Sequence, residues 1–404
     1  MRISLWVPNL IVPLETYMIT QIRDLCDQGH ELRIIAFGRL KGMPLYRDEN
    51  YPVFEQALNI APPTNDLKKA WAMLMGFFKS RHKKKLLNSL NGKRFGRLTH
   101  KFYLSWYLMA LEAHDSFGED LILCHFGHIG NVAAGLHKLG CLKTRFATFF
   151  HGFDFHRLVP RYGAAFYKLL RESGFPVFAA SSHLKSGLRD IGFTEESTFV
   201  HNMALNPLFF NPPPPEDKHW RPRPLKLITV ARLEKIKGLH LAIRALALLH
   251  KEGVAFEYAI IGDGAEKEAL KSLAREEGLS GSVRFLGALT SPKIKRHLDH
   301  SHLFLLPSII DEGGNPLVLQ EALARGLLAI GSKRGGIPEL IGECGWLMDD
   351  ETPGALLKAI KAYLETPAEE RARRQRDGQR KIRESFDIRA LNRDLLRICL
   401  RFPA

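Results

Sequence analysis

Four loops in the second half of the chain have residue types that suit a bound anion. They are ARLEKIKG, which contains Arg232 and Lys237, GDGAEKEAL from Gly262, DEGGNP from Asp311, and KRGGIPEL, which contains Gly335 and Gly336. Glycine lets the backbone approach a ligand closely, and the exposed N–H groups at the start of a helix attract negative charge. Arg232 and Lys237 add two fixed cations. The set therefore predicts a binding site for a diphosphate.

A carboxylate follows the third of these loops. Glu321 lies nine residues after Glu312, in a segment with the pattern of a helix. It could accept hydrogen bonds from the vicinal hydroxyls of a ribose, or, taken alone, be a solvent-facing helix residue. Each loop alone is a weak signal, since GDGAEK is not the GxGxxG fingerprint. Together the loops and Glu321 predict a site for a nucleoside diphosphate.

In the first half, the segment TFFHGFDF places His151 directly after an apolar, β-rich run. Gly152 and Asp154 mark the loop that follows, so His151 is predicted to lie at a strand end near a ligand, although a histidine packed in the core is the alternative. His125 and His128 in CHFGHIG could contact a ligand or serve packing. Glu15 is either a ligand-loop residue or a charge favoured by the start of a helix.

These loops need strands and helices that alternate, and the sequence supplies two such series. Strands are predicted at 2–8, 31–37, 120–126, 145–151, 176–181 and 197–202, and then at 225–231, 256–262, 282–287, 302–307 and 327–332. Helical patterns cover 15–30, 239–253, 266–278 and 292–300, and another begins near 337. Between the two series, NPPPPEDKHWRPRP contains four consecutive prolines, which fit a linker. The pattern predicts two α/β domains with parallel sheets, whose ligands lie at the carboxyl ends of the strands.

The composition points to a globular protein with a basic surface. The chain has 404 residues and a net charge of +15, and no apolar run approaches the roughly 18 residues that cross a bilayer. Its five cysteines have no CxxC spacing, and its first residues resemble a strand rather than a signal peptide, so an intracellular protein without zinc or disulfides is expected. Between about residues 70 and 97, apolar residues adjoin a basic run, which suggests a helix on an anionic membrane or a solvated basic face.

The four loops, in this order, resemble a known family. From Arg2 to about Phe402 the chain is similar to the retaining, GT-B-fold glycosyltransferases of family 4, also called group 1. ARLEKIKG resembles the family's G-R-L-x-x-x-K-G, IIGDGAEKEAL its I-G-D-G-P-x-x-x-x-L, and residues 303–341 its E-G-x-x-x-x-x-x-E-A-x-A-x-G and G-G-x-P-E block. In the first half, residues 7–37, CHFGHIGNVAAGL and TFFHGFDF resemble exopolysaccharide members of the colanic-acid type.

The resemblance implies an α/β, GT-B fold: two doubly wound, Rossmann-like domains whose parallel sheets face each other across a cleft. Residues 1–205 would be the acceptor-binding domain, with an insert at about 51–117, and residues 206–224 the linker. Residues 225–385 would bind the nucleotide sugar, and residues 386–404 would form a helix that returns to the first domain.

The resemblance also implies roles at matching positions. Arg232 and Lys237 would hold the donor diphosphate, Glu321 the ribose, and His151 would lie near the transferred sugar. The predicted catalytic residues are His151, Arg232 and Lys237. The predicted substrate-binding residues are Glu15, Gly152, Asp154, Gly262, Gly264, Glu312, Gly313, Gly314, Asn315, Pro316, Leu317 and Glu321.

Two departures bear on sugar recognition and on metal. The family's two glutamates enclose seven residues, whereas eight separate Glu312 from Glu321. Either the loop bulges by one residue so that Glu312 keeps its contact, or Gly313 takes the position and the contact is missing. No Asp-x-Asp follows a strand, and the resemblance implies cations in place of a metal, so transfer without metal or cofactor is expected.

The predicted function is therefore transfer of a sugar from a UDP- or GDP-sugar to a lipid-linked or saccharide acceptor, with retention, in bacterial exopolysaccharide or lipopolysaccharide synthesis. The protein would be cytoplasmic, with residues 70–97 at the inner face of the membrane. The alternatives are a catalytically silent nucleotide-sugar-binding homologue and an epimerase of the same fold. Nucleic-acid binding through the basic insert ranks below these.

Overall fold

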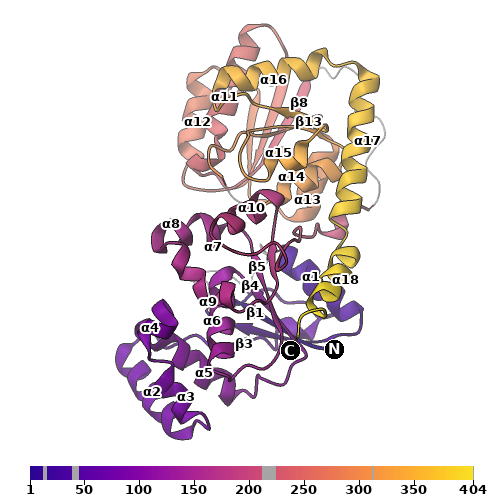
Figure 1. The fold of residues 1–404 in the computed structure, drawn as a ribbon. Coiled ribbons are helices and arrows are strands. Elements are labelled where there is room, and N and C mark those ends of the chain that lie inside the picture. The colour runs from indigo at the N-terminus through magenta and orange to yellow at the C-terminus, as the bar shows by residue number, and fades with distance from the viewer. Residues whose placement is uncertain (12–15, 39–44, 212–223, 312–313, 404) are drawn as a thin grey trace. The chain divides into compact units, whose positions relative to one another are not determined.

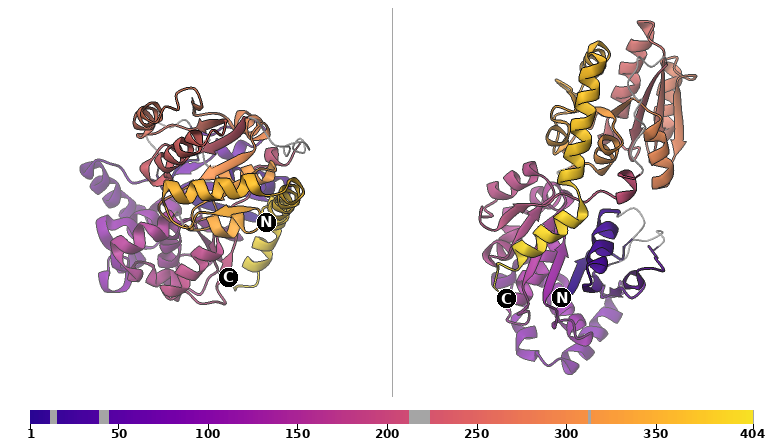
Figure 2. Two further views of the ribbon diagram at one scale, coloured as in Figure 1. Left: turned by 90° about the horizontal axis from the view of Figure 1, so that it is seen from above. Right: turned by 90° about the vertical axis from the view of Figure 1, so that its right-hand side faces the viewer.

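The computed structural model describes residues 1–11, 16–38, 45–211, 224–311 and 314–403 (Figures 1 and 2). The chain forms two compact units. Unit 1 comprises Met1–Asn202 and Ile388–Ala404, and unit 2 comprises Met203–Asp387. Most of the predicted proline-rich linker, residues 212–223, lies outside the described residues.

Unit 1 is built on a parallel sheet of seven strands in the order β3-β2-β1-β4-β5-β6-β7. The strands are β1 (Arg2–Val7), β2 (Glu31–Ala36), β3 (Leu58–Asn59), β4 (Leu121–His125), β5 (Phe146–Phe150), β6 (Val177–Ala179) and β7 (Thr198–Val200). The central strands LILCH and FATFF are buried along their whole length. Such continuous burial is typical of parallel strands that helices cover on both faces.

The helices of unit 1 cover both faces of this sheet (Figures 1 and 2). The α-helices are α1 (Thr16–Asp27), α2 (Asp66–Lys79), α3 (Lys83–Asn88), α4 (Gly92–Phe95), α5 (Tyr103–Ala113), α6 (Gly127–Lys138), α7 (Phe153–His156), α8 (Leu158–Tyr162), α9 (Lys168–Glu172), α10 (Ser182–Asp190) and α18 (Ile388–Cys399). Short 3-10 helices are η1 (Pro52–Phe54), η2 (Gly96–Phe102) and η3 (Ala164–Tyr167).

The final helix, α18, packs with α1 on one face of the sheet. Leu395, Leu396 and Cys399 share a buried apolar core with residues of α1 and of β1, β2 and β5. The buried amide of Asn392 donates hydrogen bonds to the Asp24 carboxylate (2.7 Å) and to the Gln21 carbonyl oxygen (3.3 Å). The end of the chain is therefore part of unit 1.

Unit 2 repeats the architecture with six parallel strands in the order β10-β9-β8-β11-β12-β13. The strands are β8 (Leu225–Val230), β9 (Phe256–Ile261), β10 (Val283–Gly287), β11 (Leu303–Leu306), β12 (Leu328–Gly331) and β13 (Gly345–Leu347). The helices are α11 (Leu239–Lys251), α12 (Lys267–Glu276), α13 (Ser291–Asp299), α14 (Leu317–Ala324), α15 (Ile337–Ile341), α16 (Pro353–Glu365), α17 (Ala368–Ser385), η4 (Pro207–Phe209) and η5 (Lys235–Lys237).

Two apolar clusters fill the two faces of the sheet in unit 2. One joins α11 and α16 to alternate residues of β8, β9 and β11, and the other joins α14, α15 and α17 to the residues between them. Leu205 and Phe209, near the predicted start of the linker, are buried in the second cluster. The predicted fold class is confirmed: each unit is a Rossmann-like α/β domain with a parallel sheet.

Candidate active site

In unit 2, the loops that follow β8, β9 and β11 are joined by backbone hydrogen bonds. The Leu233 amide donates to the Asp263 carbonyl oxygen (2.9 Å), and the Glu266 amide donates back to the Leu233 carbonyl oxygen (2.9 Å). The Ile309 amide donates to the Ile236 carbonyl oxygen (2.9 Å). The predicted ligand loops therefore lie side by side at the carboxyl edge of the sheet.

Glycines make this close packing of loops possible. A Cβ atom added to Gly262 would lie 1.8 Å from the Ala231 carbonyl oxygen, and one added to Gly264 would lie 2.5 Å from the Leu233 carbonyl oxygen. Gly238, which has φ +65°, would place a Cβ 1.9 Å from the Pro307 carbonyl oxygen. The glycines thus have an observed role in loop–loop contact. Their predicted approach to a ligand stays a prediction.

The two predicted cations, Arg232 and Lys237, stand in the first of these loops. The Arg232 side chain is 68% exposed and forms an ion pair with Glu234, two residues along. Lys237 is half-buried and ends η5, just before Gly238 turns the chain into α11. Glu234 was not among the predicted site residues, although its place between the two cations is visible in the sequence.

The third loop leads into α14, whose first turn lacks a side-chain cap. Gly314 and Asn315 are buried, Pro316 is the N-cap residue without a side-chain cap bond, and Leu317 begins the helix. Backbone N–H groups in the first turn of a helix have no partner within the helix and carry partial positive charge. This helix start is therefore suited to an anion.

Glu321 lies in the second turn of α14, not the first, and only 8% of its surface is exposed. Burial raises the pKa of its carboxyl group from the ordinary 4.5 to about 8. A solvent-facing position is thus excluded for Glu321. Its carboxyl group is shielded from water, and hydrogen-bond donors of a ligand would favour the ionised form.

In unit 1, the loop HGFD that follows β5 is held by the carboxylate of Asp154. Its Oδ1 accepts hydrogen bonds from the backbone N–H groups of His151 (3.1 Å) and Gly152 (3.0 Å), and its Oδ2 accepts one from Gly127 (2.8 Å). Burial raises the Asp154 pKa to about 6, and these hydrogen bonds oppose the rise. Asp154 therefore fixes the loop, while its contact with substrate stays a prediction.

His151 stands on this loop in a stack of rings. Its Nε2 lies 3.1 Å from Nδ1 of His125, the last residue of β4, and the two rings are nearly parallel at 3°. Phe149 stacks on both histidines. Burial, and then the neighbouring histidines His125 and His201, lower the pKa of His151 well below 6.5. His151 is therefore neutral near pH 7 and acts as a hydrogen-bonding group rather than a cation.

The other ring nitrogens of this pair are buried. Neither Nδ1 of His151 nor Nε2 of His125 has a hydrogen-bond partner among the described residues. Phe126, next to His125, has φ +71° and places its ring 4.8 Å from that of His151. A non-glycine residue with positive φ costs free energy and occurs often at functional sites. No sequence signal indicated this strained position.

Three predicted residues cannot be placed: Glu15, Glu312 and Gly313 lie outside the described residues.

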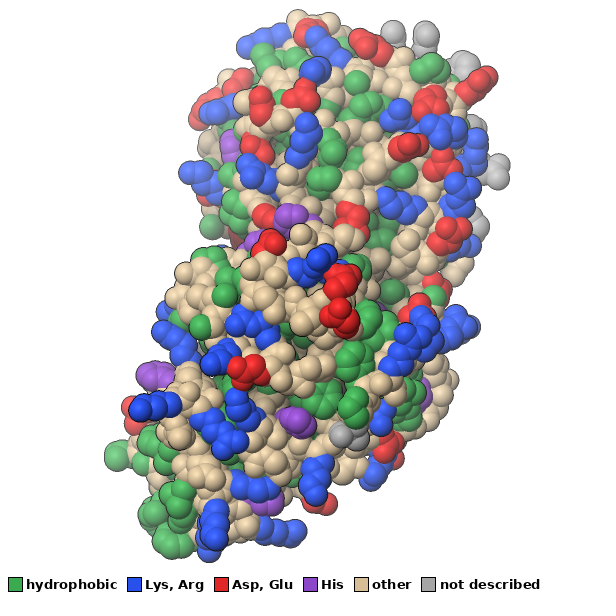
Figure 3. Space-filling view, viewed as in Figure 1, with side chains coloured by type: hydrophobic (Ala, Val, Ile, Leu, Met, Phe, Trp, Pro, Cys, Tyr) green, Lys and Arg blue, Asp and Glu red, His purple; other side chains and the backbone are tan. Residues whose placement is uncertain are grey.

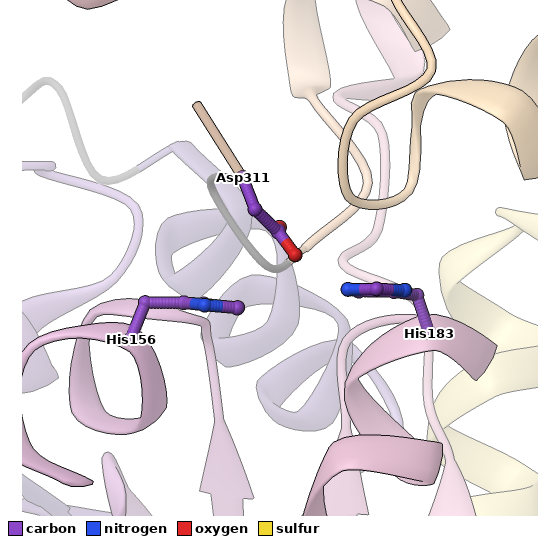
Figure 4. Close-up of side chains that lie close together, drawn as sticks. All are labelled: His156, His183 and Asp311. Atoms are coloured by element: carbon purple, nitrogen blue, oxygen red, sulfur yellow. The ribbon is translucent and has the colours of Figure 1, made fainter. Parts of the chain in front are cut away.

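Two further histidines of unit 1 lie near each other. His156 ends α7, and His183 lies in the first turn of α10. Their rings are nearly parallel, with centroids 6.4 Å apart (Figure 4). Asp311, also drawn in Figure 4, belongs to unit 2 and follows β11.

Two Rossmann-like units, with anion-type loops at a sheet edge of the second, fit the GT-B glycosyltransferases, and comparisons with known proteins identify the family. The family described as "Glycosyl transferases group 1" matches residues 215–381. Amylovoran biosynthesis glycosyltransferase AmsK of Erwinia amylovora is 30% identical over 368 residues, 88% of this chain and 89% of that protein. This chain belongs to the group 1 glycosyltransferases, and the predicted enzyme class is confirmed.

Two further comparisons extend over the whole chain. The putative colanic acid biosynthesis glycosyltransferase WcaL of Escherichia coli K12 is 29% identical over 406 residues, 98% of each chain. The crystal structure of Anabaena Alr3699/HepE in complex with UDP matches with a TM-score of 0.70 at 16% identity, covering 100% of both chains. The protein is thus related to colanic acid and amylovoran biosynthesis enzymes.

Proposed function

We propose that this glycosyltransferase moves a sugar from a UDP- or GDP-sugar to a lipid-linked or saccharide acceptor, with retention of the anomeric configuration. The product would enter bacterial exopolysaccharide or lipopolysaccharide. The relation to colanic acid and amylovoran enzymes supports this assignment. The proposed location is the cytoplasm, at the inner face of the cell membrane.

The interlocked loops of unit 2 are the observation that carries the proposal. They bring Arg232 and Lys237 to the sheet edge where the uncapped start of α14 also lies. A diphosphate would receive two charge-assisted contacts and helix N–H groups there, in place of a divalent cation. Glu321 would accept hydrogen bonds from the ribose hydroxyls. The structural neighbour HepE was solved with UDP, which agrees with a nucleoside diphosphate.

The reaction breaks the bond between C1 of the donor sugar and the diphosphate oxygen, and a bond forms between C1 and an acceptor oxygen. The diphosphate leaves with the electron pair of the broken bond, and its oxygen takes up the proton that the acceptor hydroxyl loses. Stabilising the leaving diphosphate is the main demand on the protein. His151, being neutral, would hydrogen-bond a hydroxyl of the transferred sugar.

The first experiment is a thermal-shift screen against nucleotides and nucleotide sugars. We expect one nucleoside diphosphate and the corresponding nucleotide sugar to raise the melting temperature of the wild type. The variant Arg232→Gln/Lys237→Gln should not show this rise. Transfer to a membrane lipid extract, followed by NMR of the product anomer, then tests reaction and retention. A protein stabilised by no nucleotide, or a product of inverted configuration, would contradict the proposal.

The membrane location rests on the surface of α2, which has no buried residue. Leu67, Trp71 and Phe78 are 82%, 65% and 64% exposed, and Leu74 is 50% exposed. Their spacing places them on one face of the helix. In Figure 3, hydrophobic side chains gather over the region where Figure 1 labels α2. An apolar helix face of this size, next to lysines, suits the interface of an anionic bilayer.

Vesicle sedimentation tests this location. Trp71→Glu/Phe78→Glu should lower binding to anionic vesicles at least tenfold, while Leu248→Glu, at an exposed leucine of α11, should not. Equal binding of the double variant and the wild type would contradict it. No helix in the described ranges is long and apolar enough to cross a bilayer.

A further inference from the structure

A cavity of about 430 Å³ lies in unit 1, away from the histidine stack, between α4, α6, α8 and α9. Five cations line it, Lys93, Arg94, Arg97, Lys138 and Lys168, together with one carboxylate, Glu172. In Figure 3, Lys and Arg side chains gather over the region where Figure 1 labels α4, α8 and α9. The cavity lining therefore carries an excess of positive charge.

The single carboxylate neutralises only part of this charge. Glu172 pairs with Lys138 (2.9 Å) and lies 3.7 Å from Lys168. Among the described residues, Lys93, Arg94 and Arg97 form no ion pair. Arg94 instead donates a hydrogen bond to the Lys138 carbonyl oxygen (2.9 Å), and Arg97 lies over the Tyr162 ring at 4.1 Å. Two guanidinium groups are thus held in place without an anion.

Part of the cavity lining is apolar. Leu98, Tyr162, Phe166 and Leu169 are half-buried there, and Phe95 is buried. Asn131, which is 2% exposed, also lines the cavity and donates its amide to the Phe166 carbonyl oxygen (2.7 Å). Its amide oxygen has no partner among the described residues. A lining that combines cations, apolar side chains and a buried acceptor fits a ligand that has an anionic group, an apolar part and a hydroxyl.

In the sequence, the cavity lining lies close to two exposed leucines and to the HGFD loop. Residues 93–98 follow Leu87 and Leu90, two exposed leucines that are 59% and 43% exposed. On the other side, Tyr162 comes eleven residues after His151, and α6 runs from Gly127, which holds Asp154, to Lys138. A helix of this length spans about 18 Å, so α6 connects the residue that binds Asp154 to the cavity lining over about that distance.

We propose that this cavity binds the phosphate or diphosphate ester that carries an apolar chain in the lipid-linked acceptor. The arginines and lysines would hold the phosphate groups, and the apolar part of the lining would hold the first part of the chain. The inference rests on the proposed function, because it identifies the class of acceptor that the transferase uses. We assign a lipid-borne group rather than free phosphate because of the apolar lining and the neighbouring leucines.

Calorimetric titration with farnesyl diphosphate, which is water-soluble, tests this proposal without a membrane. The titration uses full-length Arg232→Gln/Lys237→Gln protein, so that binding at the donor loops is removed. Farnesyl diphosphate should bind, inorganic pyrophosphate at least tenfold more weakly, and farnesol not measurably. Adding Arg94→Gln/Arg97→Gln should weaken the binding of farnesyl diphosphate at least tenfold, because each charge-assisted hydrogen bond contributes appreciably to affinity.

The matched control is Lys83→Gln/Lys84→Gln, two exposed lysines of α3 that do not line the cavity. It should leave farnesyl diphosphate binding unchanged, and unfolding curves should show that all variants fold. If this control lost as much affinity as Arg94→Gln/Arg97→Gln, the attraction would come from the overall charge of the region, and the proposed site would be overturned. Pyrophosphate binding as tight as farnesyl diphosphate would overturn the lipid assignment. Failure of the donor screen would instead refute the proposed function, independently of these titrations.

Discussion

The carboxyl edges of the two sheets carry different kinds of side chain. In unit 1 the edge holds neutral rings: His125, which is buried, and His151, which is half-buried, stack on Phe149, and desolvation lowers the pKa of both histidines. In unit 2 the edge holds Arg232, which is exposed, and Lys237, which is half-buried, on glycine-rich loops. The same architecture thus presents uncharged hydrogen-bonding groups in one unit and fixed charge in the other.

This difference matches the two kinds of group that a sugar transferase must bind. Sugar hydroxyls are neutral and are discriminated by oriented donors and acceptors in a dry site. A diphosphate is highly charged and is held best by cations and helix N–H groups. In unit 2 the buried carboxyl group of Glu321 is an exception, and it would serve the neutral ribose rather than the diphosphate.

The largest expected effect comes from removing the charge of the unit 2 edge. Arg232→Gln/Lys237→Gln should lower kcat/KM for the sugar nucleotide about a thousandfold or more, since losing one stabilising donor in a transition state costs a hundredfold to a thousandfold. Steady-state kinetics at saturating acceptor would measure it. Lys235→Gln, an exposed lysine of the same loop, is the control and should change little. Near-normal turnover in the double variant would show that the charge at the edge of unit 2 does not serve the reaction, and the contrast between the two units would lose its functional meaning.

A second effect tests the neutral pair of unit 1. His151→Asn should lower kcat about a hundredfold if the ring hydrogen-bonds the transferred sugar. His125→Phe keeps the stack but removes the bond to Nε2 of His151, so the tautomer of His151 is no longer fixed, and kcat should fall about tenfold. His201→Phe, at a half-buried histidine that packs on Phe149 but makes no described hydrogen bond to His151, is the matched control.

The pH profile separates this positioning role from packing. Because the pKa of His151 lies well below 6.5, wild-type kcat should show no histidine inflection between pH 6 and 9. Stability behaves differently: histidines with lowered pKa in the folded state cost stability as pH falls below the unfolded value of about 6.5. The unfolding free energy of His125→Phe should therefore decline less between pH 7 and 5. A histidine-like inflection in kcat near pH 7 would refute a neutral His151.

Glu321 offers a test with opposite signs for binding and stability. Glu321→Gln should weaken nucleoside diphosphate binding about tenfold, because an amide replaces the carboxylate that accepts from the ribose. The pKa of about 8 exceeds the unfolded value, so this carboxyl group favours folding below about pH 4.5 and progressively loses that contribution as pH rises through 8. The variant should be more stable than the wild type by on the order of a few kcal/mol at pH 9, and similar near pH 4.5. A stability difference that does not depend on pH would contradict the buried carboxyl group.

Much of the fold could be predicted because local signals agree with it. The alternation of strands and helices, the apolar strands LILCH and FATFF, and the glycine loops of unit 2 each have a local physical cause. An apolar run beside a basic one also indicated a helix near residues 70–97, but the sequence left open whether that helix lay on a membrane or in the core, and the structure shows that α2 has no buried residue. Signals of this kind lie within a few residues of one another.

The site details depend on contacts that the sequence does not encode locally. Asp154 binds the amide of Gly127, 27 residues away, and the bond between His125 and His151 joins two neighbouring strands. The burial of Glu321 and the positive φ of Phe126 are consequences of packing around them. The question whether Glu312 or Gly313 contacts the sugar stays open, because both lie outside the described residues.

The smallest expected effect refines the picture of the charged edge. Glu234 pairs with Arg232, so a bound diphosphate must compete with this carboxylate for the guanidinium group. An exposed ion pair contributes at most about 1 kcal/mol, so Glu234→Gln should tighten nucleoside diphosphate binding by about twofold to fivefold at low salt and by less at high salt. Calorimetric titration at two salt concentrations would measure it, with Glu252→Gln, an exposed acid paired with Lys361, as the control. Weaker binding in Glu234→Gln would mean that this carboxylate orients Arg232 toward the diphosphate instead of competing with it, and the edge would then use a preorganised pair rather than a free cation.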